Sequence, residues 1–227
     1  MNTQTLLDPA TWLGLGVLLA AGLMVYLFTL TFVTYRRLTH PPRRTYAWAV
    51  ARGVPGDPSE LAEPREHGVW TFARAGLAFD VWDITGDDPE GPIVVATHGW
   101  GGSRPEMLAR VPALAAAASR VVLWDMPGCG ETPGASTLGG REPLDLLALI
   151  GVIDKPVVLF GHSLGAEVSL RAAHASPDGV RGLILEAPHR RGVTPARSLL
   201  RGAQFPALVN LPIAMGLVGL LSGRGVR

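Results

Sequence analysis

The sequence predicts an α/β fold built on a mostly parallel sheet, and two of its patterns support this class. Short apolar runs, typical of strands covered by helices on both faces, alternate with longer segments whose apolar residues recur at helical spacing. Because strands and helices alternate, the parallel strands should be joined by right-handed crossovers. The 227 residues suit one such domain with appendages.

Composition argues against several other classes of protein. The net charge is +1, so there is no basic excess for binding nucleic acid, and we expect no nucleic-acid partner. No spacing of Cys and His resembles a zinc site, and we expect neither a metal nor a cofactor. The single cysteine, Cys129, rules out an internal disulfide framework and is interpreted as a packed thiol.

Residues 10–35 are uncharged and mostly apolar, which predicts one N-terminal transmembrane helix, because roughly 20 apolar residues cross a bilayer. A cleaved signal peptide is the competing interpretation, but residues 1–9 form a short tail without Lys or Arg. Basic residues instead follow the apolar run, beginning at Arg36 and Arg37. The positive-inside rule then predicts a single-pass protein whose N-terminus lies outside and whose remaining chain is cytoplasmic.

The rest of the chain divides into three predicted parts. Residues 36–68 are predicted to form a basic, Pro-rich linker with a short helix near 46–52. Residues 69–190 are predicted to form an α/β core, and residues 191–227 a lid-like or irregular C-terminal segment. The expected strands are 69–74, 77–84, 93–97, 121–124, 157–160 and 182–186. The expected helices are 107–118, opened by a capping box of Ser103 and Glu106, then 144–153 and 164–175.

Ser163 lies between a predicted strand and a predicted helix, with a glycine two residues to either side. A strand that reverses into a helix so sharply crowds its own backbone, so only residues without a Cβ fit at Gly161 and Gly165. The serine is then exposed at the strand's C-terminal end. The N–H of Leu164 lies at a helix start, where peptide dipoles favour negative charge.

Three motifs in this order resemble those of the α/β-hydrolase superfamily of the esterase/lipase kind. Residues 161–165 (Gly-His-Ser-Leu-Gly) resemble its nucleophile elbow, residues 98–102 (His-Gly-Trp-Gly-Gly) its oxyanion loop, and residues 125–130 (Asp-Met-Pro-Gly-Cys-Gly) its turn after the fourth strand. The resemblance covers residues 69–188. It implies a serine hydrolase in which Ser163 is the nucleophile and the N–H groups of Trp100 and Leu164 form the oxyanion hole.

Other polar residues of these motifs receive structural interpretations. His98 and Gly99 belong to the oxyanion loop as motif residues, with His98 bonding within the loop. Asp125 is predicted to stabilise the turn that follows it. His162 should point away from the nucleophile, and His174, on the following helix, should be exposed.

The resemblance also raises the question of the acid and the base. In the resembled family the acid commonly follows the seventh strand and the histidine the eighth, but no strand is predicted after Glu186. We therefore expect a sheet that is incomplete at its C-terminal end. Glu186 is a candidate acid and His189 a candidate base. The alternative for His189, beside two arginines, is a solvated loop residue.

Two functions of different class follow from the sequence. The first is a membrane-anchored serine hydrolase that cleaves an ester or related acyl substrate, a small and lipophilic molecule, through an acyl-enzyme. The second is a catalytically inactive or truncated hydrolase-like domain that serves as a membrane-bound binding module. The motifs around Ser163 favour the first, and the absence of the usual acid and histidine positions favours the second.

Overall fold

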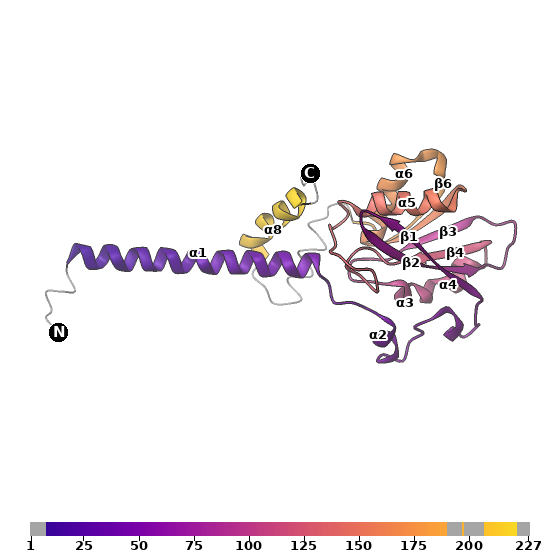
Figure 1. Cartoon of the computed structure of the whole chain (residues 1–227), viewed down its shortest axis with the longest axis horizontal. Helices are drawn as coiled ribbons and strands as arrows, with labels where there is room; N and C mark the ends of the chain where they lie inside the picture. Colours follow the sequence, from indigo (N-terminus) through magenta and orange to yellow (C-terminus); the bar gives the residue numbers. More distant parts are fainter. Residues whose placement is uncertain (1–7, 190–196, 198–206, 222–227) are drawn as a thin grey trace.

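The computed structural model describes residues 8–189, 197 and 207–221, which include a six-stranded sheet in the order β1-β2-β4-β3-β5-β6 (Figure 1). The strands are β1 (His67–Arg74), β2 (Leu77–Thr85), β3 (Ile93–Thr97), β4 (Arg120–Trp124), β5 (Val157–His162) and β6 (Val180–Glu186). Strands β4, β3, β5 and β6 are mutually parallel, whereas β1 and β2 pair antiparallel. The predicted mostly parallel α/β fold is therefore confirmed.

The first two strands form the predicted hairpin. Arg74 pairs with Leu77, and the two residues between them, Ala75 and Gly76, both have positive φ, +50° and +78°. Two consecutive residues of positive φ characterise the tight turn whose twist matches that of paired strands. The hairpin turn lies at the edge where β4 ends, because β2 runs antiparallel to β4.

Helices cover both faces of the sheet (Figure 1). On one face lie α5 (Glu142–Ile153) and α6 (Leu164–Ala175), and on the other lie α3 (Arg104–Met107) and α4 (Val111–Ala115). Each face has its own cluster of buried apolar side chains. Members of the first cluster are Phe79, Trp124, Leu146, Leu159 and Val168, and members of the second are Val94, Leu108, Val111, Leu123 and Phe160.

The predicted helix 107–118 and its capping box are wrong. The segment is divided into α3, a 3-10 turn and α4, and Pro112, which lacks an N–H, lies in the first turn of α4. Ser103 does occupy the N-cap, but its buried hydroxyl makes no hydrogen bond among the described residues. The backbone N–H of Arg104 instead donates to Asp125 Oδ1 over 2.7 Å, and Glu106 pairs with Arg44.

Helix α1 (Pro9–Thr39) has 31 residues, about 46 Å at 1.5 Å per residue, and extends four residues past the predicted end at 35. The helix ends before His40, because a residue that precedes a proline disfavours helical geometry. By length and composition alone it could cross a membrane: an 18-residue window has a mean hydropathy of 2.2 and is entirely unburied. Its apolar half extends away from the sheet (Figure 1).

Two short helices lie outside the core. The predicted linker contains α2 (Tyr46–Val50), as expected, and also the 3-10 helix Pro58–Glu60. This segment packs on the core, because Leu61 joins the second buried cluster, so the linker is more than a tether.

Most of the predicted lid-like segment, 191–227, lies outside the described residues, but Ala207–Leu221 forms helix α8 beside α1.

Candidate active site

Ser163 forms a sharp turn between β5 and α6. Its backbone has φ +54° and ψ −111°, a combination that costs a non-glycine residue about 1–3 kcal/mol. A Cβ on Gly161 would lie 2.4 Å from the carbonyl oxygen of Gly165, and a Cβ on Gly165 would lie 2.2 Å from that of Thr97. The predicted reason for both glycines is thus confirmed. The surrounding backbone leaves no space for a side chain at either position.

The predicted oxyanion loop lies directly against this turn. A Cβ built on Gly99 would approach the Cβ of Ser163 to 3.3 Å and His162 Nδ1 to 3.0 Å. The sheet explains this proximity, because the loop follows β3, the elbow follows β5, and these two strands are paired with Thr97 opposite Gly161. The backbone segments that follow these two adjacent parallel strands therefore lie against each other at the serine. The donor roles of Trp100 and Leu164 remain predictions.

Trp100 makes a contact that sequence reasoning missed. Its indole Nε1 donates to the carbonyl oxygen of Leu38 over 2.8 Å, and the backbone N–H of Ser136 donates to that of Thr39 over 2.8 Å. Both acceptors belong to the last turn of α1, whose carbonyls have no partner within the helix. The oxyanion loop is therefore attached to the end of the N-terminal helix.

His98 has the structural role that the sequence suggested. It is fully buried, its Nδ1 lies 2.7 Å from the carbonyl oxygen of Gly99, and its Nε2 accepts a hydrogen bond from the N–H of Met126 over 2.9 Å. An Nε2 that accepts requires the proton on Nδ1, so the imidazole is neutral. Burial also lowers the pKa of His98. With both nitrogens engaged, this ring holds the ends of β3 and β4 together.

Asp125 likewise stabilises its turn, as predicted. Its carboxylate accepts hydrogen bonds from the backbone N–H and the Nε of Arg104 (2.7 and 3.0 Å) and from the N–H of Glu131 (3.1 Å). The neighbouring Cys129 is buried, and desolvation raises the pKa of its thiol to about 12, which fits the predicted packed thiol.

The structure does not bring the candidate acid to the candidate base. The carboxylate of Glu186 accepts two hydrogen bonds from Arg110, at 2.6 and 2.9 Å, and this guanidinium lowers the pKa of Glu186. The backbone of Glu186 does reach the elbow, since its carbonyl oxygen accepts from the N–H of Ser163 over 2.9 Å. His189 is half-buried rather than solvated, and its Nδ1 has no hydrogen-bond partner among the described residues.

The other described groups at this edge add neither a histidine bonded to Ser163 nor a metal site. Within the described ranges, Ser163 Oγ makes no hydrogen bond to a histidine, and His174 is exposed on α6, as predicted. In the same part of the chain, no group of three or more His, Cys, Asp or Glu side chains could hold a metal ion. The geometry therefore offers a strained, half-exposed serine against which the loop after β3 packs.

Comparison with known proteins places this geometry in a family. A model described as the Alpha/beta hydrolase family matches residues 93–225, which is more than half of the chain. The chain belongs to the alpha/beta hydrolase family. The superfamily resemblance carried by the elbow, the oxyanion loop and the glycine turn is thus confirmed.

Two curated proteins are similar in sequence to part of this alpha/beta hydrolase. It is 38% identical over 132 residues to the dihydrolipoyllysine-residue acetyltransferase component of an acetoin cleaving system from Pseudomonas putida, covering 57% of this chain and 35% of that protein. It is 36% identical over 118 residues to a pimeloyl-[acyl-carrier protein] methyl ester esterase from Neisseria meningitidis, covering 51% of this chain and 43% of that protein. The chain thus spans less than half the length of these relatives.

A solved structure is also similar. A Vigna radiata epoxide hydrolase mutant matches at 26% identity and a TM-score of 0.46, covering 53% of this chain and 38% of that one.

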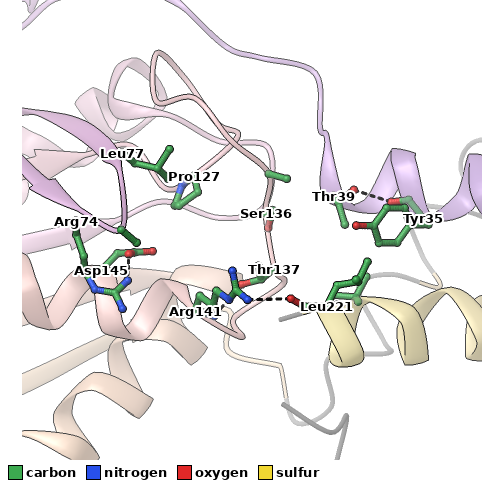
Figure 2. A pocket seen from close by; sticks show the side chains of 13 residues that line it. Tyr35, Thr39, Arg74, Leu77, Pro127, Ser136, Thr137, Arg141, Asp145 and Leu221 are labelled. Atoms are coloured by element: carbon green, nitrogen blue, oxygen red, sulfur yellow. Dashed lines mark hydrogen bonds and ion pairs between the residues drawn. The ribbon is translucent and has the colours of Figure 1, made fainter. Parts of the chain in front are cut away.

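A cavity of about 320 Å³ lies at the same edge of the sheet, and Ser163 is not among its lining residues. Its walls come from the hairpin turn, the loop after β4, and helices α1, α5 and α8. Figure 2 shows Arg74 beside Asp145 on one side, and Arg141 donating to the carbonyl oxygen of Leu221 on the other. The cavity therefore lies between the core of this alpha/beta hydrolase and the apolar helices α1 and α8.

The carboxyl group of Asp145 in this cavity should make stability depend on pH. Burial raises the pKa of Asp145 to about 6, although Arg74 donates to it, whereas an unfolded chain would have about 3.9. The folded state therefore holds this proton more tightly and loses stability as pH rises from about 4 to 6. Asp145→Asn removes this titrating group. The free energy of unfolding of the variant minus that of the wild type should therefore increase by about 2 kcal/mol between about pH 4 and pH 6.

Urea unfolding of both proteins in detergent micelles, at steps between pH 4 and 8, measures this difference. The exposed Asp178→Asn is the control for a change of charge alone. Parallel stability curves for wild type and Asp145→Asn would contradict the prediction.

Proposed function

We propose that this alpha/beta hydrolase is a membrane-anchored serine hydrolase that cleaves an ester or related acyl substrate. Ser163 attacks the acyl carbonyl, and the N–H groups of Trp100 and Leu164 hold the oxyanion. The observation that carries the proposal is the strained backbone of Ser163, enclosed by glycines at 161 and 165 and touching Gly99. Strain that costs stability and exposes one hydroxyl beside two loops of backbone amides is typical of a nucleophile.

The esterase names among the relatives support an acyl substrate. The apolar helix α1 supports a membrane anchor, with the N-terminus outside and the hydrolase domain in the cytoplasm, and so a lipophilic acyl group.

A fluorophosphonate probe tests the nucleophile directly, because the hydroxyl of an activated serine attacks its phosphorus, fluoride leaves, and a serine phosphonate ester remains. The full chain in detergent micelles is incubated with the probe, digested, and analysed by mass spectrometry. We expect the adduct on Ser163 and on no other serine. Heat-denatured protein is the control for unspecific reaction. A folded chain that carries no adduct on Ser163 would refute the proposal.

His189 is the proposed general base, with Glu186 as the proposed acid. The support is positional: the Glu186 carbonyl is bonded to the elbow, His189 follows three residues later, and its Nδ1 lacks a hydrogen-bond partner among the described residues. To orient the imidazole, the Glu186 carboxylate would have to exchange Arg110 for His189.

His189→Ala is therefore expected to lower the turnover of p-nitrophenyl butyrate by about 10²- to 10⁴-fold, the usual contribution of a general base. His174→Ala, at an exposed site on α6, is the matched control and should keep full turnover. Turnover measured from pH 5 to 9 should also lose its imidazole-dependent limb in His189→Ala. Unchanged turnover in this variant would remove His189 as the base.

A non-catalytic binding module is the second candidate function. The ion pair between Glu186 and Arg110 favours it, because a carboxylate engaged by an arginine does not orient a histidine. If the protein is a non-catalytic binding module, we expect no probe adduct on Ser163 and no turnover that depends on His189.

A further inference from the structure

Helix α8 is apolar on all sides. The segment Ala207–Leu221 contains no charged residue, and Asn210 is its only polar side chain. Large apolar side chains on it are nevertheless exposed, with Ile213 at 56%, Leu217 at 37% and Leu220 at 75%. Helices without a polar face occur in protein cores or in membranes. The exposure of these side chains argues against a core position.

The buried side of α8 packs on α1. Leu211, Ala214 and Met215 form a buried cluster with Leu38. Asn210 is 1% exposed, and its Nδ2 donates to Thr34 Oγ1 and lies 3.4 Å from the carbonyl oxygen of Leu30. Hydrogen bonds from Asn and Thr side chains between helices are the kind of contact that joins helices within a bilayer.

The level of this contact along α1 limits how α8 can be placed. Asn210 lies beside Leu30 and Thr34, whereas Leu221 is held near the core by Arg141, which donates to its carbonyl oxygen over 2.9 Å. The 15 residues of α8 measure about 22 Å, which is too short for a hydrocarbon core of about 30 Å. The helix therefore starts at the level of the apolar part of α1 and ends at the hydrolase domain.

We propose that α8 is a short membrane-embedded helix, which enters a lipid bilayer beside α1 without crossing it and exposes Ile213, Leu217 and Leu220 to lipid. The inference rests on the anchoring of α1 in the proposed function. The exposed apolar surface of α8 continues that of α1. Figure 1 shows α8 alongside the end of α1 that joins the core. That same end of α1 carries the contact with Trp100, so the oxyanion loop would lie close to the membrane surface.

Fluorescence quenching of single-cysteine variants tests this placement. Leu217→Cys and Leu220→Cys are labelled with an environment-sensitive NBD thiol reagent, and the full chain is reconstituted in vesicles of phosphatidylcholine and phosphatidylglycerol. Native Cys129 should stay unlabelled, because burial raises the pKa of its thiol to about 12, and the wild type verifies this. Leu19→Cys, 66% exposed on α1, reports the anchor, and Val152→Cys, 57% exposed on α5, reports the aqueous domain.

We expect doxyl-labelled lipid to quench the labels at 217, 220 and 19 at least twofold more than the label at 152. Iodide in the buffer should quench the label at 152 alone. If the labels at 217 and 220 respond to iodide as the label at 152 does, α8 lies in water and the inference fails, while lipid quenching at 19 leaves the anchor intact.

Two further results would also overturn the inference. Shielding of positions 217 and 220 from both quenchers would show that protein, such as a second copy of this chain, covers α8. A label at 19 that lipid does not quench would overturn the anchor and, with it, this inference. Fluorophosphonate labelling of Ser163 is measured separately, so the hydrolase proposal is judged on its own result.

Discussion

Ser163→Ala is expected to lower the turnover of p-nitrophenyl butyrate by about 10⁶-fold, the size of effect seen when a serine hydrolase loses its nucleophile. The free energy of unfolding should change by less than about 0.5 kcal/mol. The Ser163 hydroxyl makes no hydrogen bond among the described residues, and alanine meets the same strain at φ +54°. Turnover is measured by nitrophenolate release, and stability by urea unfolding in the same detergent.

Two companion variants separate chemistry from folding in this experiment. Ser163→Gly also removes the hydroxyl but relieves the strain, so it should be inactive and more stable than Ser163→Ala by about 1 kcal/mol. Ser169→Ala removes a buried hydroxyl one turn and a half along α6, and it should keep its turnover. Turnover that survives in Ser163→Ala would refute the assignment of the nucleophile.

Local sequence signals were sufficient where the backbone itself sets the geometry. The elbow was predictable because the spacing of Gly161, Ser163 and Gly165 reflects a steric requirement that any strand-to-helix turn of this sharpness must meet. The buried strands β3 and β5 were predictable because their apolar runs are short and continuous. Residue periodicity also located α6 at its observed bounds, 164–175.

Predictions failed where partners distant in sequence competed for the same groups. The capping box at Ser103 looked complete locally, but Asp125 takes the N–H of Arg104, and Arg44 takes the carboxylate of Glu106. The bond from Trp100 to Leu38 joins residues 62 positions apart, and no pattern in either segment indicates it. The partner of Glu186 was missed for the same reason, because Arg110 lies 76 residues away.

These long-range contacts explain why the site was only partly predictable. The backbone geometry of Ser163 is local, whereas the orientation of an acid and a base depends on how separate loops meet at the edge of the sheet. Glu186 shows the difference. Its carbonyl oxygen accepts a hydrogen bond from Ser163 because β5 and β6 are neighbouring strands, but its carboxylate forms an ion pair with Arg110. Sequence reasoning therefore reached the serine and not its partners.

Gly165→Ala is expected to destabilise the fold by about 3 kcal/mol or more, a large share of the 5–15 kcal/mol that stabilises a typical domain. The added Cβ would lie 2.2 Å from the carbonyl oxygen of Thr97 and 2.5 Å from that of His98. Both contacts are with backbone, which no side-chain rotation can relieve, so β3 and α6 would have to separate. Turnover should fall with stability, because the same displacement moves the oxyanion loop away from Ser163.

Gly182→Ala provides the matched control on the neighbouring strand β6. A Cβ there would meet only the side chain of Val158, at 3.7 Å, which is ordinary van der Waals contact. Its free energy of unfolding should stay within about 1 kcal/mol of the wild type, or rise, since alanine reduces the freedom of the unfolded chain. Urea unfolding of the two variants beside the wild type measures the contrast. Equal stabilities would show that α6 does not press on β3 as closely as the Cβ distances require.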